Sequence, residues 1–317
     1  MSYAKTLDKN EQGKLDLIMK VSIIIPHHNS SSLLKRLLKS IPISLNAQII
    51  VVDDNSKEDE YKSVENLRSE FDFDLYKNEG RTAGGARNTG LKYAIGDWLI
   101  FADADDFFTE SLFSLVVSHA ESDADVIFFN ISSQVSETGK RAHRDAHIKS
   151  LIIKYNTTSD ERYLRCMYLV PWGKMYRRSF VDEKGIQYEE RIAGNDMWFA
   201  VRTGVEANKI EIDERELYVC TVSEGSITTT VSKERHEAKL QATLKTNNYL
   251  RIHGCGKFQV SVLYFIAKAK QFGMEYLIHV LNECRKNRSN LFIGFGKILH
   301  YKKVLEDRQN PTYSKNK

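Results

Sequence analysis

Three short, mostly apolar runs separated by amphipathic stretches constrain the fold of this chain most. The runs are residues Val21–Ile25, Ile49–Val52 and Trp98–Ala102, which are rich in Ile, Val and aromatic side chains. Each predicts a strand that is buried on both faces. Residues with helical periodicity follow the runs, at 29–40, 57–70 and 86–95. Strands that alternate with helices predict an α/β fold with a Rossmann-like, doubly wound and mostly parallel sheet.

The second half of the chain has a looser pattern. We expect strands at Asp125–Ile131, Pro171–Tyr176, Ile210–Ile212 and Leu217–Val222, a polar excursion over 134–148, a helix at Asp196–Gly204, and helices from about Ser232 onward. This organisation predicts an N-terminal arm over 1–20, an α/β domain over 21–231 with halves 21–106 and 107–231, and a helical C-terminal extension over 232–317.

Composition points to a globular protein of a reducing compartment. Hydrophobic residues make up 42% of the 317 residues and charged residues 28%, which is ordinary for a chain with a real core. The four cysteines lack CxxC or Cys/His spacing, which argues against a zinc site and a disulfide framework. We find no apolar stretch of about 18 residues and no signal-peptide core. The expected location is therefore the cytoplasm, with residues 1–18 either a frayed arm or a product of start-codon choice.

Charge is distributed unevenly along the chain. Residues 257–317 contain 12 Lys and Arg against 4 Asp and Glu, a charge of +8, which leaves −4 for residues 1–256 out of a total of +4. A mildly acidic body argues against a nucleic-acid partner. The basic tail indicates an anionic partner. Its mixed apolar and basic stretches predict either helices that pack on the α/β domain or interfacial helices that dock on anionic lipid.

Three carboxylates follow directly on the run that ends at Ala102. Asp103, Asp105 and Asp106 would repel one another unless a cation lies among them. Mg²⁺ or Mn²⁺, which prefer oxygen ligands, would relieve this repulsion. The alternative is a solvated acidic turn in which Asp106 caps a helix over Phe107–His119, and spacing alone does not decide between the two.

Two more polar segments follow expected strands. Asp53 and Asp54 end the second run, where a carboxylate can accept from the N3–H of a uracil-type base; the alternative is a turn with a helix N-cap. Gly80–Gly85, with Arg81 and Arg87 nearby, is typical of a phosphate-binding segment at a helix N-terminus. Its spacing matches neither a P-loop nor GxGxxG. Ligands of doubly wound sheets bind at the carboxyl ends of the strands.

Seven sequence segments together form a pattern that indicates a protein family. They are VSIIIPHHN (21–29), IIVVDDNS (49–56), NEGRTAGGARNTG (78–90), IFADADD (100–106), PWGKMY (171–176), GND (194–196) and GSIT (225–228). In this order and spacing, over about residues 21–230, the chain resembles bacterial family-2 inverting glycosyltransferases with the GT-A fold, of the surface-polysaccharide type.

The resemblance implies a role for each matching residue. Binding of the nucleotide sugar falls to Pro26, His28, Asn29, Asp53, Asp54, Gly80, Arg87, Asp103 and Ala104. Asp103 and Asp105 would hold Mn²⁺ or Mg²⁺, and Asp196 would be the catalytic base. Acceptor contacts are expected from Trp172, Lys174 and Asn195, with a plain core tryptophan as the alternative for Trp172. His28 stands where the family usually has Tyr, and Asn195 where it usually has Glu.

The implied function is a metal-dependent, inverting transfer of a sugar from a nucleotide-diphosphate donor, with a UDP-sugar as the expected one. The acceptor would be a hydroxyl of a saccharide or lipid-linked saccharide in a growing capsule, lipopolysaccharide or exopolysaccharide, at the inner face of the bacterial cytoplasmic membrane. Two alternatives remain from the residues alone: a nucleotide-sugar-binding protein without turnover, and a nucleotidyltransferase.

Overall fold

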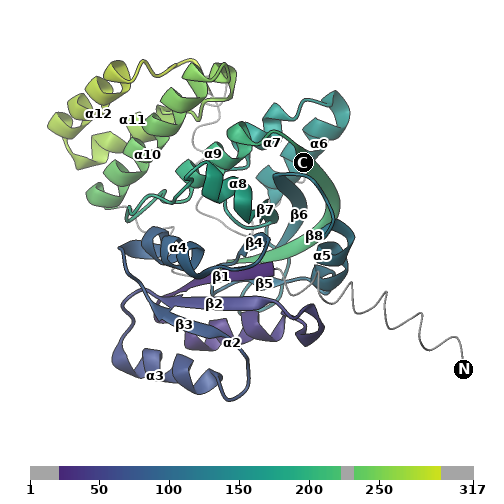
Figure 1. Cartoon of the computed structure of the whole chain (residues 1–317). Coiled ribbons are helices and arrows are strands. Elements are labelled where there is room, and N and C mark those ends of the chain that lie inside the picture. The colour runs from purple at the N-terminus through teal and green to yellow at the C-terminus, as the bar shows by residue number, and fades with distance from the viewer. Residues whose placement is uncertain (1–20, 223–231, 294–317) are drawn as a thin grey trace, which may run out of the picture. The chain divides into compact units, whose positions relative to one another are not determined.

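The computed structural model describes residues 21–222 and 232–293, and these contain one eight-stranded sheet with helices around it (Figure 1). The chain forms two compact units. We call them the first unit (Met1–Ser132, Pro171–Glu190 and Glu206–Cys220) and the second unit (Ser133–Val170, Arg191–Val205 and Thr221–Lys317). The predicted division of the chain into an N-terminal arm, an α/β domain and a C-terminal extension remains a prediction.

The parallel part of the sheet lies in the first unit. It consists of β1 (Val21–His27), β2 (Gln48–Asp53), β3 (Asp74–Lys77) and β4 (Trp98–Phe101). The strand order is β3-β2-β1-β4, and all three neighbouring pairs are parallel. The chain therefore proceeds outward on one side of β1 and then returns to the other side. This reversal is the topological switch point at which doubly wound sheets bind ligands.

The remaining strands extend the sheet in antiparallel fashion. They are β5 (Phe107–Phe108), β6 (Val126–Val135), β7 (Lys174–Arg177) and β8 (Ile210–Val222). The order continues from β4 as β7-β6-β8-β5, with β4 antiparallel to β7 and β5 antiparallel to β8. The predicted α/β fold class is confirmed.

Helices of the first unit follow from the spacing of their apolar residues. They are α2 (Ser31–Lys39), α3 (Glu58–Leu67), α4 (Thr82–Tyr93), α5 (Leu112–His119) and α8 (Arg178–Glu183). In α2, Leu34, Leu37 and Leu38 are buried at helical spacing. All seven residues of β1 are buried, and α4 packs on β1, where Gly90 lies against Ile24.

The second unit contains α6 (Ala146–Thr158), α7 (Arg162–Met167), α10 (Lys233–Ile252), α11 (Leu263–Ala269), α12 (Met274–Lys286) and all of α9 (Met197–Glu206) except its last residue. A cluster of apolar residues joins α10, α11 and α12 through Leu240, Leu244, Phe265 and Val280. The predicted C-terminal helices are confirmed up to Lys286, where α12 ends, whereas residues 287–293 are not helical. No helix among the described residues is long and apolar enough to cross a bilayer.

Three local predictions were wrong. The helix expected from Phe107 begins at Leu112, because Phe107 and Phe108 pair with Val219 and Tyr218 of β8. The two strands expected at 210–212 and 217–222 are the single strand β8. The helix expected from Ala86 begins at Thr82, so two glycines lie in its first turn.

Candidate functional site

The polar residues predicted from three strand ends gather at one edge of the sheet. In the register, His27 lies opposite Asp53, and Ile24 lies opposite Phe101. Backbone hydrogen bonds extend the alignment past the strand ends, from Asp54 N to His27 O (2.7 Å) and from Ala102 N to Ile24 O (3.1 Å). The segments after β1, β2 and β4 are therefore neighbours. Pro26, opposite Val52, is buried one residue inside this edge.

His27 is the buried residue that holds Asp53 in place. Its Nδ1 lies 3.1 Å from Asp53 Oδ1, and Ser30 N donates to its Nε2 at 3.2 Å. Because Nε2 accepts, Nδ1 carries the proton and the ring is neutral. Burial lowers the pKa of His27 against the opposing effect of Asp53. Asp53 also accepts from Ser56 N at 3.1 Å. Sequence reasoning singled out His28 and missed His27.

His28 presents an oriented and exposed imidazole. Its Nδ1 donates to Asp54 O at 2.7 Å, and its Nε2 accepts from Asn29 Nδ2 at 2.9 Å. Asn29 adopts a left-handed conformation (φ 48°) and binds Lys57 N through Oδ1 at 2.8 Å. The carboxylate of Asp54 accepts from Asn78 Nδ2 at 2.6 Å. The structure therefore brings His28, Asn29 and Asp54 together, and it adds Asn78, which the sequence did not single out.

The glycine-rich segment is closely packed, which differs from the open phosphate cradle we expected. Gly80 N donates to Asn78 Oδ1 (2.8 Å), and Arg81 N donates to Glu190 Oε2 (3.0 Å). A Cβ at Gly80 would lie 2.5 Å from Glu190 Oε1, and one at Gly85 would lie 2.9 Å from the carbonyl carbon of Gly80. Close backbone packing thus requires glycine at Gly85, whereas the side chain of Glu190 could move away from a Cβ at Gly80. The carboxylate that accepts from Arg81 N in this segment is that of Glu190, another residue that the sequence did not indicate.

Arg87 extends from α4 to the end of β4. Its Nη2 donates to Asp103 Oδ1 at 2.6 Å, and its guanidinium lies 5.3 Å from the centroid of the Tyr188 ring. Asn88 fixes the backbone of Tyr188 through two hydrogen bonds of 3.0 and 2.8 Å. The predicted cationic residue and the predicted metal ligand are therefore an ion pair in this structure.

Residues 103–106 form a tight turn that we call the carboxylate turn. Asp106 N donates to Asp103 O at 3.0 Å. One carboxylate oxygen from each of Asp103, Asp105 and Asp106 lies within 4.8 Å of the others. Ala104 is buried, and Asp105 O accepts from Arg36 Nη2. Three clustered carboxylates supply the oxygen-only ligands that Mg²⁺ and Mn²⁺ prefer, so the residues fit such an ion.

Asp106 is a member of this turn and not the helix cap that we considered. Its side chain is fully buried and its Oδ2 accepts from the hydroxyl of Tyr218 at 2.8 Å. The next helix begins only at Leu112, after Ser111. Tyr218 also accepts from Asp103 N at 2.8 Å. Burial and the two carboxylates raise the pKa of Tyr218 well above its usual range.

Trp172 and Lys174, the expected acceptor contacts, are interior side chains. The Trp172 ring is stacked on Tyr218 with a centroid distance of 5.5 Å and an interplanar angle of 14°. Lys174 is 1% exposed, with Nζ 5.1 Å from the centroid of the Phe128 ring. Their burial leaves little surface for a saccharide, which argues against the direct acceptor contact expected of both.

Asn195 and Asp196 belong to the second unit. Asp196 directly precedes α9 and accepts from Ala200 N through its backbone oxygen at 3.0 Å. Asn195 Nδ2 donates to Arg191 O at 3.3 Å. Gly194 has φ 73°, and a Cβ there would lie 3.1 Å from Cβ of Ala242 in α10. The predicted base therefore lies directly before a helix, and it is partly exposed.

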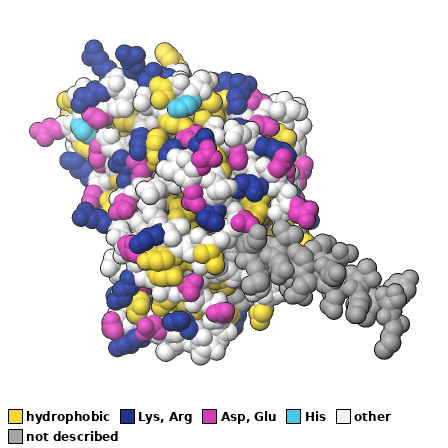
Figure 2. Space-filling view, viewed as in Figure 1, with side chains coloured by type: hydrophobic (Ala, Val, Ile, Leu, Met, Phe, Trp, Pro, Cys, Tyr) yellow, Lys and Arg dark blue, Asp and Glu magenta, His cyan; other side chains and the backbone are white. Residues whose placement is uncertain are grey.

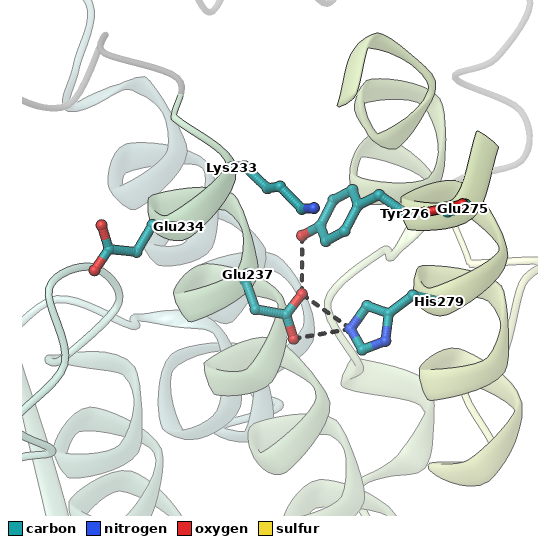
Figure 3. A pocket seen from close by; sticks show the side chains of 6 residues that line it. All are labelled: Lys233, Glu234, Glu237, Glu275, Tyr276 and His279. Carbon is teal, nitrogen blue, oxygen red and sulfur yellow. Dashed lines mark hydrogen bonds and ion pairs between the residues drawn. The ribbon is translucent and has the colours of Figure 1, made fainter. Parts of the chain in front are cut away.

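The second unit also contains a cavity of about 670 Å³ that no sequence motif indicated. Its lining comes from the first two turns of α10 and α12: Lys233, Glu234, Glu237, Glu275, Tyr276 and His279. Figure 3 shows Glu237 accepting from the Tyr276 hydroxyl (2.8 Å) and lying 3.2 Å from His279 Nε2. Burial raises the pKa of Glu237, but hydrogen bonds from Gln241, His279 and Tyr276 outweigh it and leave the pKa lowered.

Comparison with known proteins gives a consistent picture. The family model described as glycosyl transferase family 2 matches residues 22–185. The putative glycosyltransferase EpsH of Bacillus subtilis (strain 168) is 24% identical over 243 residues, covering 72% of this chain and 67% of the relative. The poly(ribitol-phosphate) beta-N-acetylglucosaminyltransferase TarS of Staphylococcus aureus (strain Mu50 / ATCC 700699) is 25% identical over 217 residues, covering 66% of this chain. That match spans only 36% of TarS.

Solved structures share the fold. The crystal structure of S. aureus TarS 1–349 in complex with UDP-GlcNAc has a TM-score of 0.57 at 21% identity, covering 86% of this chain and 75% of that chain. The mannosyltransferase PcManGT from Pyrobaculum calidifontis, in complex with GDP-Man and Mn²⁺, has a TM-score of 0.52 at 14% identity, covering 94% and 88%.

Proposed function

Because the chain belongs to glycosyl transferase family 2, we propose that it moves a sugar from a nucleotide-diphosphate donor to a hydroxyl of a growing bacterial surface glycan, with inversion at the anomeric carbon. The chain is a glycosyltransferase, which sets aside the nucleotidyltransferase alternative. The observation that carries the finer proposal is the carboxylate turn beside Arg87, at the same sheet edge as His28 and Asp54.

A nucleotide donor suits this edge of the sheet. The exposed ring of His28 offers a face on which a base can stack. The carboxylate of Asp54 retains lone pairs that can accept from the N3–H of uracil. Complexes of TarS with UDP-GlcNAc and UDP support a UDP-sugar. We therefore propose that His28, Asn29 and Asp54 hold the base, with Asp53 and Pro26 supporting them, while Gly80 and Ala104 line the donor site.

A divalent cation suits the carboxylate turn. Asp103 and Asp105 would hold Mn²⁺ or Mg²⁺, and the structure of PcManGT with Mn²⁺ supports this choice. When bound, such an ion neutralises the charge of the departing diphosphate. Arg87 orients the carboxylate of Asp103 through their 2.6 Å ion pair.

Asp196 is the proposed general base. It would remove the proton of the acceptor hydroxyl, whose oxygen then bonds to the anomeric carbon as the bond to the diphosphate breaks. Attack from the face opposite the leaving group inverts the configuration. Asn195, which precedes it, is the remaining candidate for an acceptor contact.

One experiment tests the reaction and its base together. A panel of nucleotide sugars is screened with Mn²⁺ and acceptor saccharides, with Asp196→Asn as the test and Asp160→Asn in the same unit as the control. We expect Asp196→Asn to lower turnover by about 10²–10⁴-fold and to leave donor affinity, measured by calorimetry, within about twofold of the parent. Turnover of Asp196→Asn equal to that of the parent would refute the assignment of Asp196 as the general base. If the parent bound donors but transferred no sugar, this would favour the alternative of a nucleotide-sugar-binding protein without turnover.

Metal dependence has its own test. Asp105→Ala should abolish the increase in donor affinity that Mn²⁺ produces, because it removes one of the two proposed ligands. Calorimetry with and without Mn²⁺ measures this. An equal increase in the parent and the variant would contradict the assignment.

An anionic membrane surface is the proposed partner of the C-terminal helices. One face of α12 packs Tyr276, Val280 and Cys284, while Ile278 and Leu281 are exposed on the other. Arg285 and Lys286 follow in its last turn. Figure 2 shows Lys and Arg side chains together with hydrophobic ones over the region that α11 and α12 occupy in Figure 1. Such a face suits the interface of anionic lipid at the inner side of the cytoplasmic membrane.

Vesicle binding tests this partner. Ile278→Glu should weaken binding to phosphatidylserine vesicles, and added salt should weaken binding of the parent because its Lys and Arg side chains contribute to it. The control is Ile153→Glu, which adds the same charge to the exposed face of α6. Equal binding by Ile278→Glu and the control would favour the alternative, in which the basic helices only pack within the protein.

A further inference from the structure

The residue that ties the carboxylate turn together comes from a distant strand. Tyr218 lies in β8, 115 residues from Asp103 along the chain. Its hydroxyl accepts from Asp103 N at 2.8 Å and donates to Asp106 Oδ2 at 2.8 Å. One oxygen atom therefore spans the first and the fourth residue of the turn. The backbone bond from Asp106 N to Asp103 O, 3.0 Å long, closes the same turn.

The position of the Tyr218 hydroxyl is itself fixed. Its ring has no exposed surface. Trp172 is stacked on one face at 5.5 Å, and Phe108 meets the ring edge-on with the same centroid distance. Phe108 is also the strand partner of Tyr218. A buried aromatic ring that is packed on two sides cannot move its hydroxyl without moving its neighbours.

Carboxylates this close to one another need such a support. Oxygen atoms of Asp103, Asp105 and Asp106 lie within 4.8 Å of each other, and like charges at this distance repel. Arg87 restrains Asp103, whereas Asp106 is fully buried and needs a donor of its own. The Tyr218 hydroxyl supplies such a donor and so fixes the orientation of the Asp106 carboxylate.

We propose that Tyr218 is a positioning residue that preorganises the carboxylate turn for a divalent cation, with Trp172 as the support of its ring. This inference rests on the proposed metal dependence and goes beyond it, because it assigns a role to a residue that would not itself bind the ion. Partners that orient metal ligands typically contribute about 10–100-fold to metal affinity. The stacked Trp172 thereby gains a role that the acceptor hypothesis did not give it.

The test is Mn²⁺ affinity without donor or acceptor, measured by electron paramagnetic resonance of free Mn²⁺ in titrations of the whole chain. Tyr218→Phe keeps the ring and removes only the hydroxyl. We expect its Kd for Mn²⁺ to rise about 10–100-fold, and saturating Mn²⁺ to recover most of the turnover that is lost at low Mn²⁺.

The matched control is Tyr176→Phe. Tyr176 is equally buried in the first unit, and its hydroxyl donates to Pro171 O at 2.9 Å and not to a residue of the carboxylate turn. Loss of the Tyr176 hydroxyl should leave the Kd for Mn²⁺ within about twofold of that of the parent. A Tyr218→Phe variant that binds Mn²⁺ as tightly as this control would overturn the proposal.

Two further results keep the test decisive. If Tyr218→Phe does not fold, as judged by circular dichroism, Trp172→Leu replaces it, and it should raise the Kd for Mn²⁺ because it removes the ring that is stacked on Tyr218. A parent that binds no Mn²⁺ would instead refute the metal dependence in the proposed function. A parent that binds Mn²⁺, together with a Trp172→Leu variant that binds equally well, would refute only the positioning role of Tyr218 and Trp172.

Discussion

Arg87 and Asp103 form an ion pair 2.6 Å long in which the arginine side chain is 6% exposed and the aspartate side chain 27%. The pair joins α4 to the end of β4, so it connects the glycine-rich segment with the carboxylate turn. The pair therefore holds these two segments, which are separated in sequence, together at one edge of the sheet.

Loss of Arg87 should destabilise the protein. Arg87→Met leaves Asp103 beside two other carboxylates, and we expect the free energy of unfolding at pH 7 to fall by about 1–3 kcal/mol. Urea denaturation measures it. The control is Lys62→Met, which breaks an exposed pair with Glu58 and should cost about 0–1 kcal/mol. Equal losses in the two variants would argue against this role of the Arg87 pair.

Gly90 should not tolerate even a methyl group. Alanine usually stabilises a helix interior relative to glycine, but a Cβ here would overlap Cγ2 of Ile24 in β1. We expect Gly90→Ala to lower the free energy of unfolding by about 1–3 kcal/mol, as overpacking does. Gly256→Ala, where the nearest atom would lie 3.7 Å away, is the control and should change stability by less than about 0.5 kcal/mol. A stabilising Gly90→Ala would show that α4 can shift on β1.

His27 should make stability depend on pH. Burial holds its pKa in the folded protein below the ordinary value of 6.5, so the unfolded chain binds more protons just below pH 6.5. The free energy of unfolding should therefore fall as the pH drops from about 7 to 5. In His27→Gln this fall should be smaller. His253→Gln, which alters an exposed ring, should retain the parent's pH dependence, and an unchanged profile in His27→Gln would exclude this contribution.

Glu237 should stabilise the packing of α10 on α12. The Tyr276 hydroxyl and His279 Nε2 bind the carboxylate of Glu237 (Figure 3), and Gln241 also donates to it. These hydrogen bonds hold the pKa of Glu237 in the folded protein below 4.5. The stabilisation is therefore present above pH 4.5 and is lost as the pH falls further. Glu237→Gln should cost about 1 kcal/mol at pH 7 and less at pH 3.5, by thermal denaturation. Glu234→Gln, an exposed residue of the same cavity, should have little effect at either pH.

The sequence could locate the sheet edge because local patterns determine it. The apolar runs at β1, β2 and β4 predict buried parallel strands, and the polar residues after them must then meet. Asp54 and Asp103 were found in this way, whereas His28 and Asn29 were indicated by the family resemblance. Their roles in binding remain predictions, since position at an edge does not identify a ligand.

Burial and long-range contacts could not be predicted in the same way. Trp172 and Lys174 carry groups that suit a saccharide, but β7 lies in the middle of the sheet order, and both side chains are in the interior. The helix expected at Phe107 gave way to a strand because β8, about 100 residues later, pairs with it. Local propensity is a weak prior that such tertiary pairing overrides.

The sequence by itself therefore determined the α/β class, the alternation of strands and helices up to β4, and the carboxylates at Asp103, Asp105 and Asp106. Only the tertiary structure decided what surrounds those carboxylates. Tyr218 and Arg36 reach the carboxylate turn from distant segments, and Glu190 reaches the glycine-rich segment. No spacing in the chain encodes that approach. The physical reason is that strand periodicity is local, whereas the partner of a buried polar group is selected by the packing of the whole sheet.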